Sequence, residues 1–130
     1  MKIDTKPLGI GKGFVEVVGS WGQQDMADDL MIALYETDAN QNDPIKGLKA
    51  NKEMRKKAME FFKSVFALTD EQCQKIMTDV SGNVLNIYIS YVCGLIEGGN
   101  EQSFKEFNDS LKPIEKENED PKKEQRKPEK

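Results

Sequence analysis

Apolar residues recur along most of this chain at the three- and four-residue spacing of helices that bury one face. The pattern predicts helices over about residues 24–37, 51–68, 69–80, 83–97 and 101–111. The second has the clearest two-sided pattern, with apolar residues from Met54 to Val65 on one side and mostly basic residues on the other. The fourth is apolar nearly all round, which is typical of a helix at the centre of a bundle or in an oligomer interface.

The first twenty residues predict a short β-hairpin rather than a helix. Four glycines and Pro7 interrupt this region, and both residue types disfavour helical backbone. Phe14–Val18 is short, β-branched and bounded by glycine, which indicates a strand, and Ile3–Thr5 can pair with it. Because a lone two-stranded hairpin is only marginally stable, this one must pack on helices or on another chain.

The C-terminal residues have a different composition. Residues 113–130 contain one aliphatic residue, Ile114, among prolines and charges of both signs. Such a segment cannot bury enough apolar surface to offset its ordering entropy, so we expect Pro113 to end the last helix and the rest to be disordered. The sequence therefore predicts a mainly α domain over residues 1–112, a small bundle of about five helices with a short N-terminal β-hairpin, followed by a disordered charged tail.

The composition argues against catalysis. The 130 residues include no histidine, which excludes Ser-His and Cys-His nucleophiles and His-metal sites. Cys73 and Cys93 lie twenty residues apart without a CxxC pair, so neither a disulfide scaffold nor a four-ligand zinc site is built. We expect both thiols to be core residues, and we expect no enzymatic activity, no cofactor and no metal.

Three polar patterns resemble ligand sites only in part. Gly9–Gly13 lacks the spacing and the hydroxyl residue of a phosphate-binding loop. Asp38–Asn42 resembles the opening of a calcium loop, but Asp43 and Lys49 stand where that loop needs Gly and Glu. The acids in the first helix, of which Asp25 and Asp28 share a face, are better explained by interaction with the helix dipole. We interpret the first two as ordinary loops.

Charge is distributed unevenly along the chain, although the net charge is only −4. Residues 16–43 carry seven acids and no base, whereas residues 46–63 carry seven bases and two acids. Two neighbouring helices can neutralise each other in this way, or the second can bind an acidic partner or nucleic acid. The low overall charge and the lack of exposed aromatic residues argue against nucleic acid.

Six side chains are candidates for partner binding. Trp21 stands alone at the junction of strand and helix, where it is either an anchor over the core or an interface hot spot. The basic helix and the aromatic residues of the second and fourth helices supply the others, Lys56, Lys57, Phe66, Tyr88 and Tyr91. Methionine adapts to varied surfaces, so the six methionines suit the same role. The hairpin edge and the all-round apolar fourth helix also predict self-association.

No membrane partner is expected. The longest apolar region, Val84–Ile96, is thirteen residues long, whereas a membrane-spanning helix needs about 20. The N-terminus lacks the apolar stretch of a signal peptide, and two unpaired thiols suit a reducing compartment. We therefore expect the protein in the cytoplasm.

The order of these elements resembles the tail assembly chaperones of long-tailed phages and prophages of Gram-positive bacteria. The likeness is closest from Pro7–Ile10 through Phe14–Val18, and from Asp29–Met31 to Tyr35, and it covers about residues 1–112. It rests on layout: a Gly-rich N-terminal strand segment, an acidic first helix, a small helical body and a charged tail.

This resemblance implies a non-enzymatic protein that coats the tape measure protein and recruits tail tube subunits. Such a protein acts in the cytoplasm of the host bacterium and is absent from the finished virion. The alternative is a small phage regulatory or nucleic-acid-binding helical protein that acts through the basic helix at residues 46–63.

Overall fold

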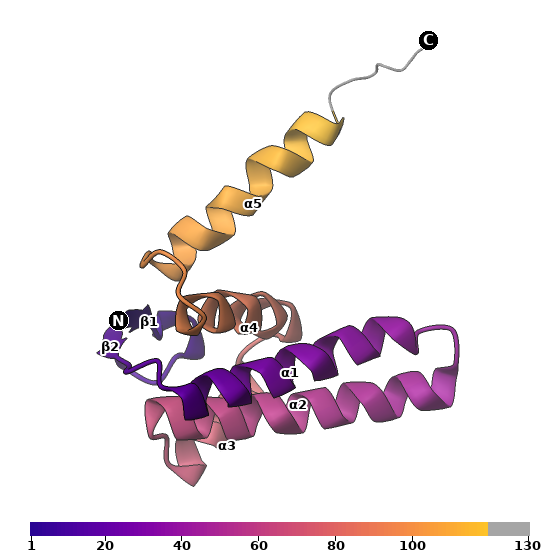
Figure 1. The fold of residues 1–130 in the computed structure, drawn as a ribbon, viewed down its shortest axis with the longest axis horizontal. Coiled ribbons are helices and arrows are strands. Elements are labelled where there is room, and N and C mark those ends of the chain that lie inside the picture. Colours follow the sequence, from indigo (N-terminus) through magenta and orange to yellow (C-terminus); the bar gives the residue numbers. More distant parts are fainter. Residues whose placement is uncertain (120–130) are drawn as a thin grey trace.

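In the computed structural model, the described backbone covers residues 1–119 and the described side chains cover residues 1–111. The elements are β1 (Lys2–Asp4), the 3-10 helix η1 (Lys6–Leu8), β2 (Phe14–Glu16), α1 (Trp21–Ala39), α2 (Pro44–Phe66), α3 (Asp70–Asp79), α4 (Gly82–Ile96) and α5 (Phe104–Glu119) (Figure 1). The predicted mainly α fold, with five helices and an N-terminal hairpin, is confirmed.

The hairpin pairs as the sequence predicts. β1 and β2 are antiparallel, with Ile3 opposite Val15. Ile3 is fully buried and belongs to the hydrophobic core. The hairpin therefore leans on the helical body, which supplies the support that two strands lack alone.

α1 and α2 form a long helical hairpin, and both begin earlier than their apolar patterns predict. Ser20 caps α1, its side chain accepting from the Gln23 N–H while the Gln23 side chain bonds back. The Asp43 side chain caps α2 by accepting from two backbone N–H groups, with Pro44 at the first helical position. These caps satisfy the free donors at the helix ends. They shift the starts from the predicted residues 24 and 51 to 21 and 44.

The next two helices begin and end close to their predicted bounds. Thr69 and Gln72 form the expected capping box of α3. The hydroxyl of Ser81 accepts from the Val84 N–H at the start of α4. Gly98 has a φ of 105° just after α4, a backbone region that favours glycine.

The last helix departs from expectation. Its backbone continues through Pro113 to Glu119, so the prediction that Pro113 ends the helix is wrong. A proline removes one backbone donor and strains the preceding turn, but helices can pass through one, as α5 does. The remaining part of the predicted disordered tail, residues 120–130, lies outside the described residues.

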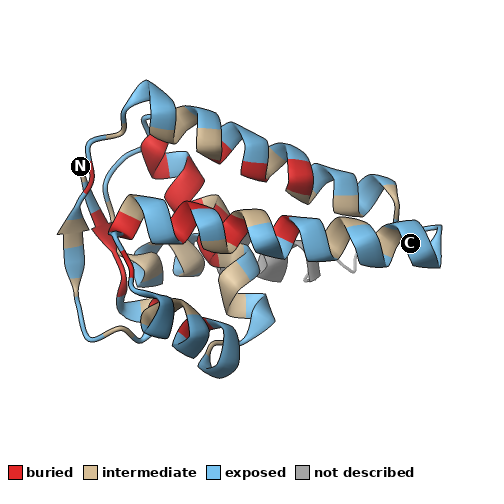
Figure 2. Cartoon of the chain, turned by 90° about the horizontal axis from the view of Figure 1, so that it is seen from below, coloured by how far each residue is buried: buried red, intermediate tan, exposed pale blue. Residues whose placement is uncertain are grey.

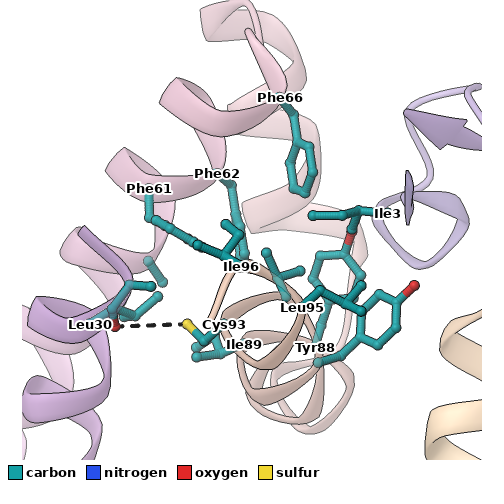
Figure 3. Close-up of a cluster of buried hydrophobic side chains, with 14 of the residues drawn as sticks. Ile3, Leu30, Phe61, Phe62, Phe66, Tyr88, Ile89, Cys93, Leu95 and Ile96 are labelled. Atoms are coloured by element: carbon teal, nitrogen blue, oxygen red, sulfur yellow. Dashed lines mark hydrogen bonds between the residues drawn. The ribbon is translucent and has the colours of Figure 1, made fainter. Parts of the chain in front are cut away.

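α4 is the central helix, as its all-round apolar sequence predicts. Its residues Tyr88, Ile89, Val92 and Ile96 are buried to at least 99%. α1 packs along both α2 and α4, and the buried residues lie on the faces that these helices turn toward one another (Figure 2). Aromatic side chains from α2 gather over α4 (Figure 3), where Phe62 lies 5.5 Å from Tyr88 between ring centroids.

A buried polar network joins the hairpin to the helices. The Tyr88 Oη donates to the Asp4 carbonyl at 2.7 Å, and the Asp4 N–H donates to the Tyr91 Oη at 3.1 Å. Tyr91 in turn donates to the Gln102 carbonyl at 2.6 Å. Asp4 is itself buried, and its carboxylate accepts from the Phe104 N–H at 3.0 Å. Burial raises the pKa of both phenols, so they remain neutral hydrogen-bonding groups.

Candidate functional site

A hollow of about 550 Å³ opens between α2, α3 and the start of α4. Its apolar lining includes three of the six methionines, and this hollow is termed the methionine groove. The residues that line it are Asn51, Met54, Arg55, Ala58, Met59, Phe62, Met77, Val80, Ser81, Gly82, Asn83, Leu85, Asn86 and Ile89. The volume falls within the ordinary range of ligand pockets, roughly 300–1,000 Å³.

The groove follows from the sequence of the elements around it. α2 turns its apolar stripe toward α4, which places Met54 and Phe62 at the inner side. α4 is apolar on more sides than α2 and α1 cover, so Leu85 remains half-buried and faces the hollow. The start of α4, from its cap Ser81 to Asn83, brings short polar residues to the rim. The result is an apolar floor with amide and hydroxyl groups at its edge.

A second hollow of about 580 Å³ lies between α2 and α3, next to the groove. Arg55, Met59 and Met77 line both hollows. The second adds basic residues from α2 and polar ones from α3: Lys52, Lys56, Glu60, Asp70, Cys73 and Gln74. The two hollows together form one grooved surface, in which flexible methionine side chains lie beside the basic residues Lys52, Arg55 and Lys56, termed the basic rim. Such side chains adapt readily to varied apolar partners.

Three cations of the basic rim lie beside the acids Glu60 and Asp70 without pairing with them. Lys52, Arg55 and Lys56 are exposed, and within the described residues they form no ion pair. Lys63 pairs with Asp70 at the far end of the second hollow; this hydrogen bond and charge interaction raises the pKa of Lys63 and lowers the pKa of Asp70. The free cations of the rim are thus available to an acidic partner.

The structure separates the six predicted partner-binding residues into two groups. Trp21 is 85% exposed at the start of α1, and Lys56 is exposed on the rim. Lys57 is half-buried and lies 3.9 Å from Glu53, measured between side-chain nitrogen and oxygen. These three residues remain candidates.

Phe66, Tyr88 and Tyr91 are buried, so their assignment to a partner surface is wrong for this fold. Each packs in the aromatic cluster around α4, and both tyrosine hydroxyls are engaged in the Asp4 network. The sequence interpretation missed the groove methionines and Arg55 as site residues. The six methionines could have indicated an adaptable surface, but the sequence does not show which of them share one surface, because those of the groove lie on two different helices.

The cysteines differ in surroundings. Cys93 is buried as expected; its thiol lies 3.8 Å from the Ala27 carbonyl oxygen (Figure 3), and burial raises its pKa to about 12. Such a thiol stays protonated and unreactive at neutral pH. Cys73 is only half-buried: it packs against the core and also lines the second hollow, so the expectation of a core position holds for this residue only in part.

The partial motifs in the sequence form turns. Gly9 and Gly11 have φ values of 69° and 80° in the loop between the strands. Asp38 lies in the last turn of α1, which ends at Ala39, and Asp43 caps α2, so the calcium-like stretch is the end of one helix and the turn to the next. Among the described residues, no three acidic or cysteine side chains are grouped to hold a metal ion. No helix in that part of the chain is long and apolar enough to cross a membrane.

Comparison of the chain with protein-family models, with curated proteins and with solved structures finds no match.

Proposed function

We propose that this protein is a tail assembly chaperone that binds a helical segment of the tape measure protein in the methionine groove and helps to recruit tail tube subunits. The observation that carries the proposal is the groove itself, a methionine-lined hollow beside unpaired cations. The layout of the sequence, which resembles that of such chaperones, supplies the partner's identity. The protein binds and releases its partner without catalysis, in the cytoplasm of the host bacterium.

The chemistry of the groove suits a helix. An amphipathic helix places apolar side chains at intervals of three and four residues, which a groove between helices can receive. Met54, Met59 and Met77 line this groove, and methionine accommodates different apolar side chains with little cost in packing. A chaperone that coats a long protein meets many sequences in turn, so an adaptable surface serves it better than a rigid one.

The rim selects the polar side of the same helix. Asn51, Asn83 and Asn86 lie at the edge of the groove, where amide groups can hydrogen-bond a partner's polar residues. Arg55 lines both hollows and is exposed, so an acidic residue of the partner can pair with it. Charged rims accelerate association and fix register more than they add affinity, which fits a contact that must be reversed.

A single substitution in the groove tests the proposal. Met77 is 54% exposed, so Met77→Glu places a charge in the groove without disrupting the core. Thr78→Glu adds the same charge to an exposed neighbouring position of α3 that does not line either hollow. Titration calorimetry against helical fragments of a tape measure protein should show weaker binding, by at least about ten-fold, for the first variant only. Equal binding by both variants contradicts the proposal.

One observation favours a second function, nucleic-acid binding through residues 46–63. Lys49, Lys52 and Lys56 are exposed on one face of α2 and form no ion pair within the described residues. Phosphate contacts would make the affinity fall steeply with salt. Fluorescence anisotropy with a labelled DNA duplex at two salt concentrations distinguishes the two functions. Nucleic-acid binding predicts a complex with the duplex that weakens as salt is raised, whereas the chaperone proposal predicts no complex with the duplex at micromolar protein.

A further inference from the structure

α1 exposes a stripe of large apolar and acidic side chains on the side opposite its buried face. Trp21, Asp25, Asp28, Ile32 and Tyr35 follow one another at helical spacing and form this stripe, termed the acidic face. Trp21, Ile32 and Tyr35 are 85%, 56% and 63% exposed. Ala27, Leu30 and Ala33 are the buried residues of α1, so the acidic face lies on the side of the helix that is turned away from the core.

α2 exposes a matching stripe of opposite charge. Ile45, Leu48, Lys49, Lys52 and Lys56 lie on the outer side of the helix and are termed the basic face. Ile45 and Leu48 are 67% and 64% exposed. They lie in the half of the α1–α2 hairpin that extends past α4 (Figure 1). Each of the two faces therefore combines large apolar side chains with charges mostly of one sign; on α2, the exposed Glu53 and Glu60 lie one turn from Lys49 and Lys56.

The two faces do not neutralise each other within one chain. α1 and α2 pack side by side, as the neutralising interpretation of the sequence requires. Yet no ion pair joins them in the part of the chain that the structure describes, where the pairs of α2 are Lys57–Glu53 and Lys63–Asp70. The inner sides of both helices are apolar, so their charges point outward.

The acidic face brings carboxyl groups close to one another. Glu97, just after α4, lies beside Asp28, and its pKa is raised by a hydrogen bond with Asp28, by desolvation, and by the charges of Asp28 and Asp25. Carboxyl groups this close repel one another when ionised. A cation supplied from outside the chain would relieve that repulsion.

We propose that the acidic face of one copy docks on the basic face of a second copy. The contact places Asp25 and Asp28 against Lys52 and Lys56, and the exposed apolar side chains of both faces bury one another. Exposed apolar side chains with a charged surround are typical of interaction sites, and the complementary charges fix orientation. Each copy carries both faces, so the association either closes as a two-fold dimer or continues head to tail.

The inference stands apart from the proposed function, because it needs no partner other than the chain itself. Lys52 and Lys56 also line the second hollow, so loss of tape measure binding is tested separately, with Met77→Glu. A wild-type chain that binds in the groove but does not self-associate would contradict only this inference. The opposite result would contradict only the proposed function.

A charge-swap experiment tests the contact. Asp25→Lys/Asp28→Lys makes both faces basic, and Lys52→Glu/Lys56→Glu makes both acidic. In sedimentation velocity over a range of concentrations at low salt, we expect the wild-type chain to associate. Each double variant alone should associate more weakly by at least about ten-fold, because like charges then meet. An equimolar mixture should regain association, since the basic α1 face then meets the acidic α2 face.

Matched controls separate the contact from net charge. Glu71→Lys/Asp79→Lys and Lys12→Glu/Lys75→Glu change net charge equally at exposed positions outside both faces, and both should associate like wild type. Circular dichroism melting checks that each variant folds. If a charge-swap variant does not fold, Trp21→Ala/Tyr35→Ala takes its place; it keeps every charge and should also weaken association. A strictly monomeric wild-type chain, or a mixture that fails to associate, overturns the proposal.

Discussion

The backbone N–H of Asp4 donates a 3.1 Å hydrogen bond to the Oη of Tyr91, although 87 residues separate the two in the chain. This bond is buried, and the same Oη donates onward to the Gln102 carbonyl. Tyr91 therefore links β1, α4 and the segment before α5. The N-terminal hairpin is held by specific polar contacts as well as by burial of Ile3.

Tyr91→Phe should destabilise the fold by about 1–3 kcal/mol, because it leaves a buried donor at Asp4 and an acceptor at Gln102 without their partner. Urea denaturation followed by circular dichroism measures the change in the free energy of unfolding. Tyr35→Phe removes the same hydroxyl from an exposed position and should have little effect. Equal stability of Tyr91→Phe and wild type would show that water replaces the hydroxyl.

Ala67→Gly should stabilise the protein. Ala67 follows α2 with a φ of 53° and ψ of 51°, a left-handed conformation that costs a non-glycine residue roughly 1–2 kcal/mol. Glycine relieves this strain but gives the unfolded chain more freedom, so the net gain should be about 0.5–1 kcal/mol. The same change at Ala50, inside α2, should destabilise by a similar amount, and thermal melting distinguishes the two signs.

Glu97→Gln should stabilise the protein at neutral pH and have a smaller effect in acid. The hydrogen bond with Asp28 and the nearby carboxylates raise the pKa of Glu97 in the folded state. Folding therefore favours its protonated form, and stability falls as the pH rises from the ordinary glutamate range through the raised pKa. Melting temperatures of both chains across that range measure the difference.

A control keeps this effect distinct from the general loss of one negative charge. Glu36→Gln removes a charge from an exposed position of α1, and its effect on melting should not follow the same pH dependence. If the benefit of Glu97→Gln persists unchanged below the ordinary glutamate range, repulsion between Glu97 and Asp28 is not its cause.

The sequence predicts the elements of this fold because the relevant signals are local. The capping boxes at Ser20–Gln23 and Thr69–Gln72, and the Asp43–Pro44 start of α2, are short patterns with a direct physical cause. Apolar spacing alone places the starts of α1 and α2 too late, since neither first turn contributes a buried residue and the apolar Trp21 and Ile45 are exposed. The caps mark those starts correctly.

The candidate site is less predictable because it depends on tertiary packing. An all-round apolar α4 does not reveal which of its sides other helices cover. For that reason Tyr88 and Tyr91, predicted as partner contacts, are buried, whereas Leu85 on the same helix faces the groove. Met59 of α2 and Met77 of α3 line the same two hollows, and no sequence spacing shows that these two helices bring them to one surface.

Phe62→Ala should destabilise the domain by about 3–5 kcal/mol, the usual cost of truncating a buried phenylalanine. Phe62 is 1% exposed, and its ring packs against Phe61, Phe66 and Tyr88. Lys56→Glu on the opposite side of α2 should cost little stability, because Lys56 is exposed. Chemical denaturation of both variants therefore separates the packing side of α2 from its binding side. If Lys56→Glu unfolds the protein, the basic face is not a free surface. That result would contradict both the binding of an acidic partner at the basic rim and the proposed contact between copies.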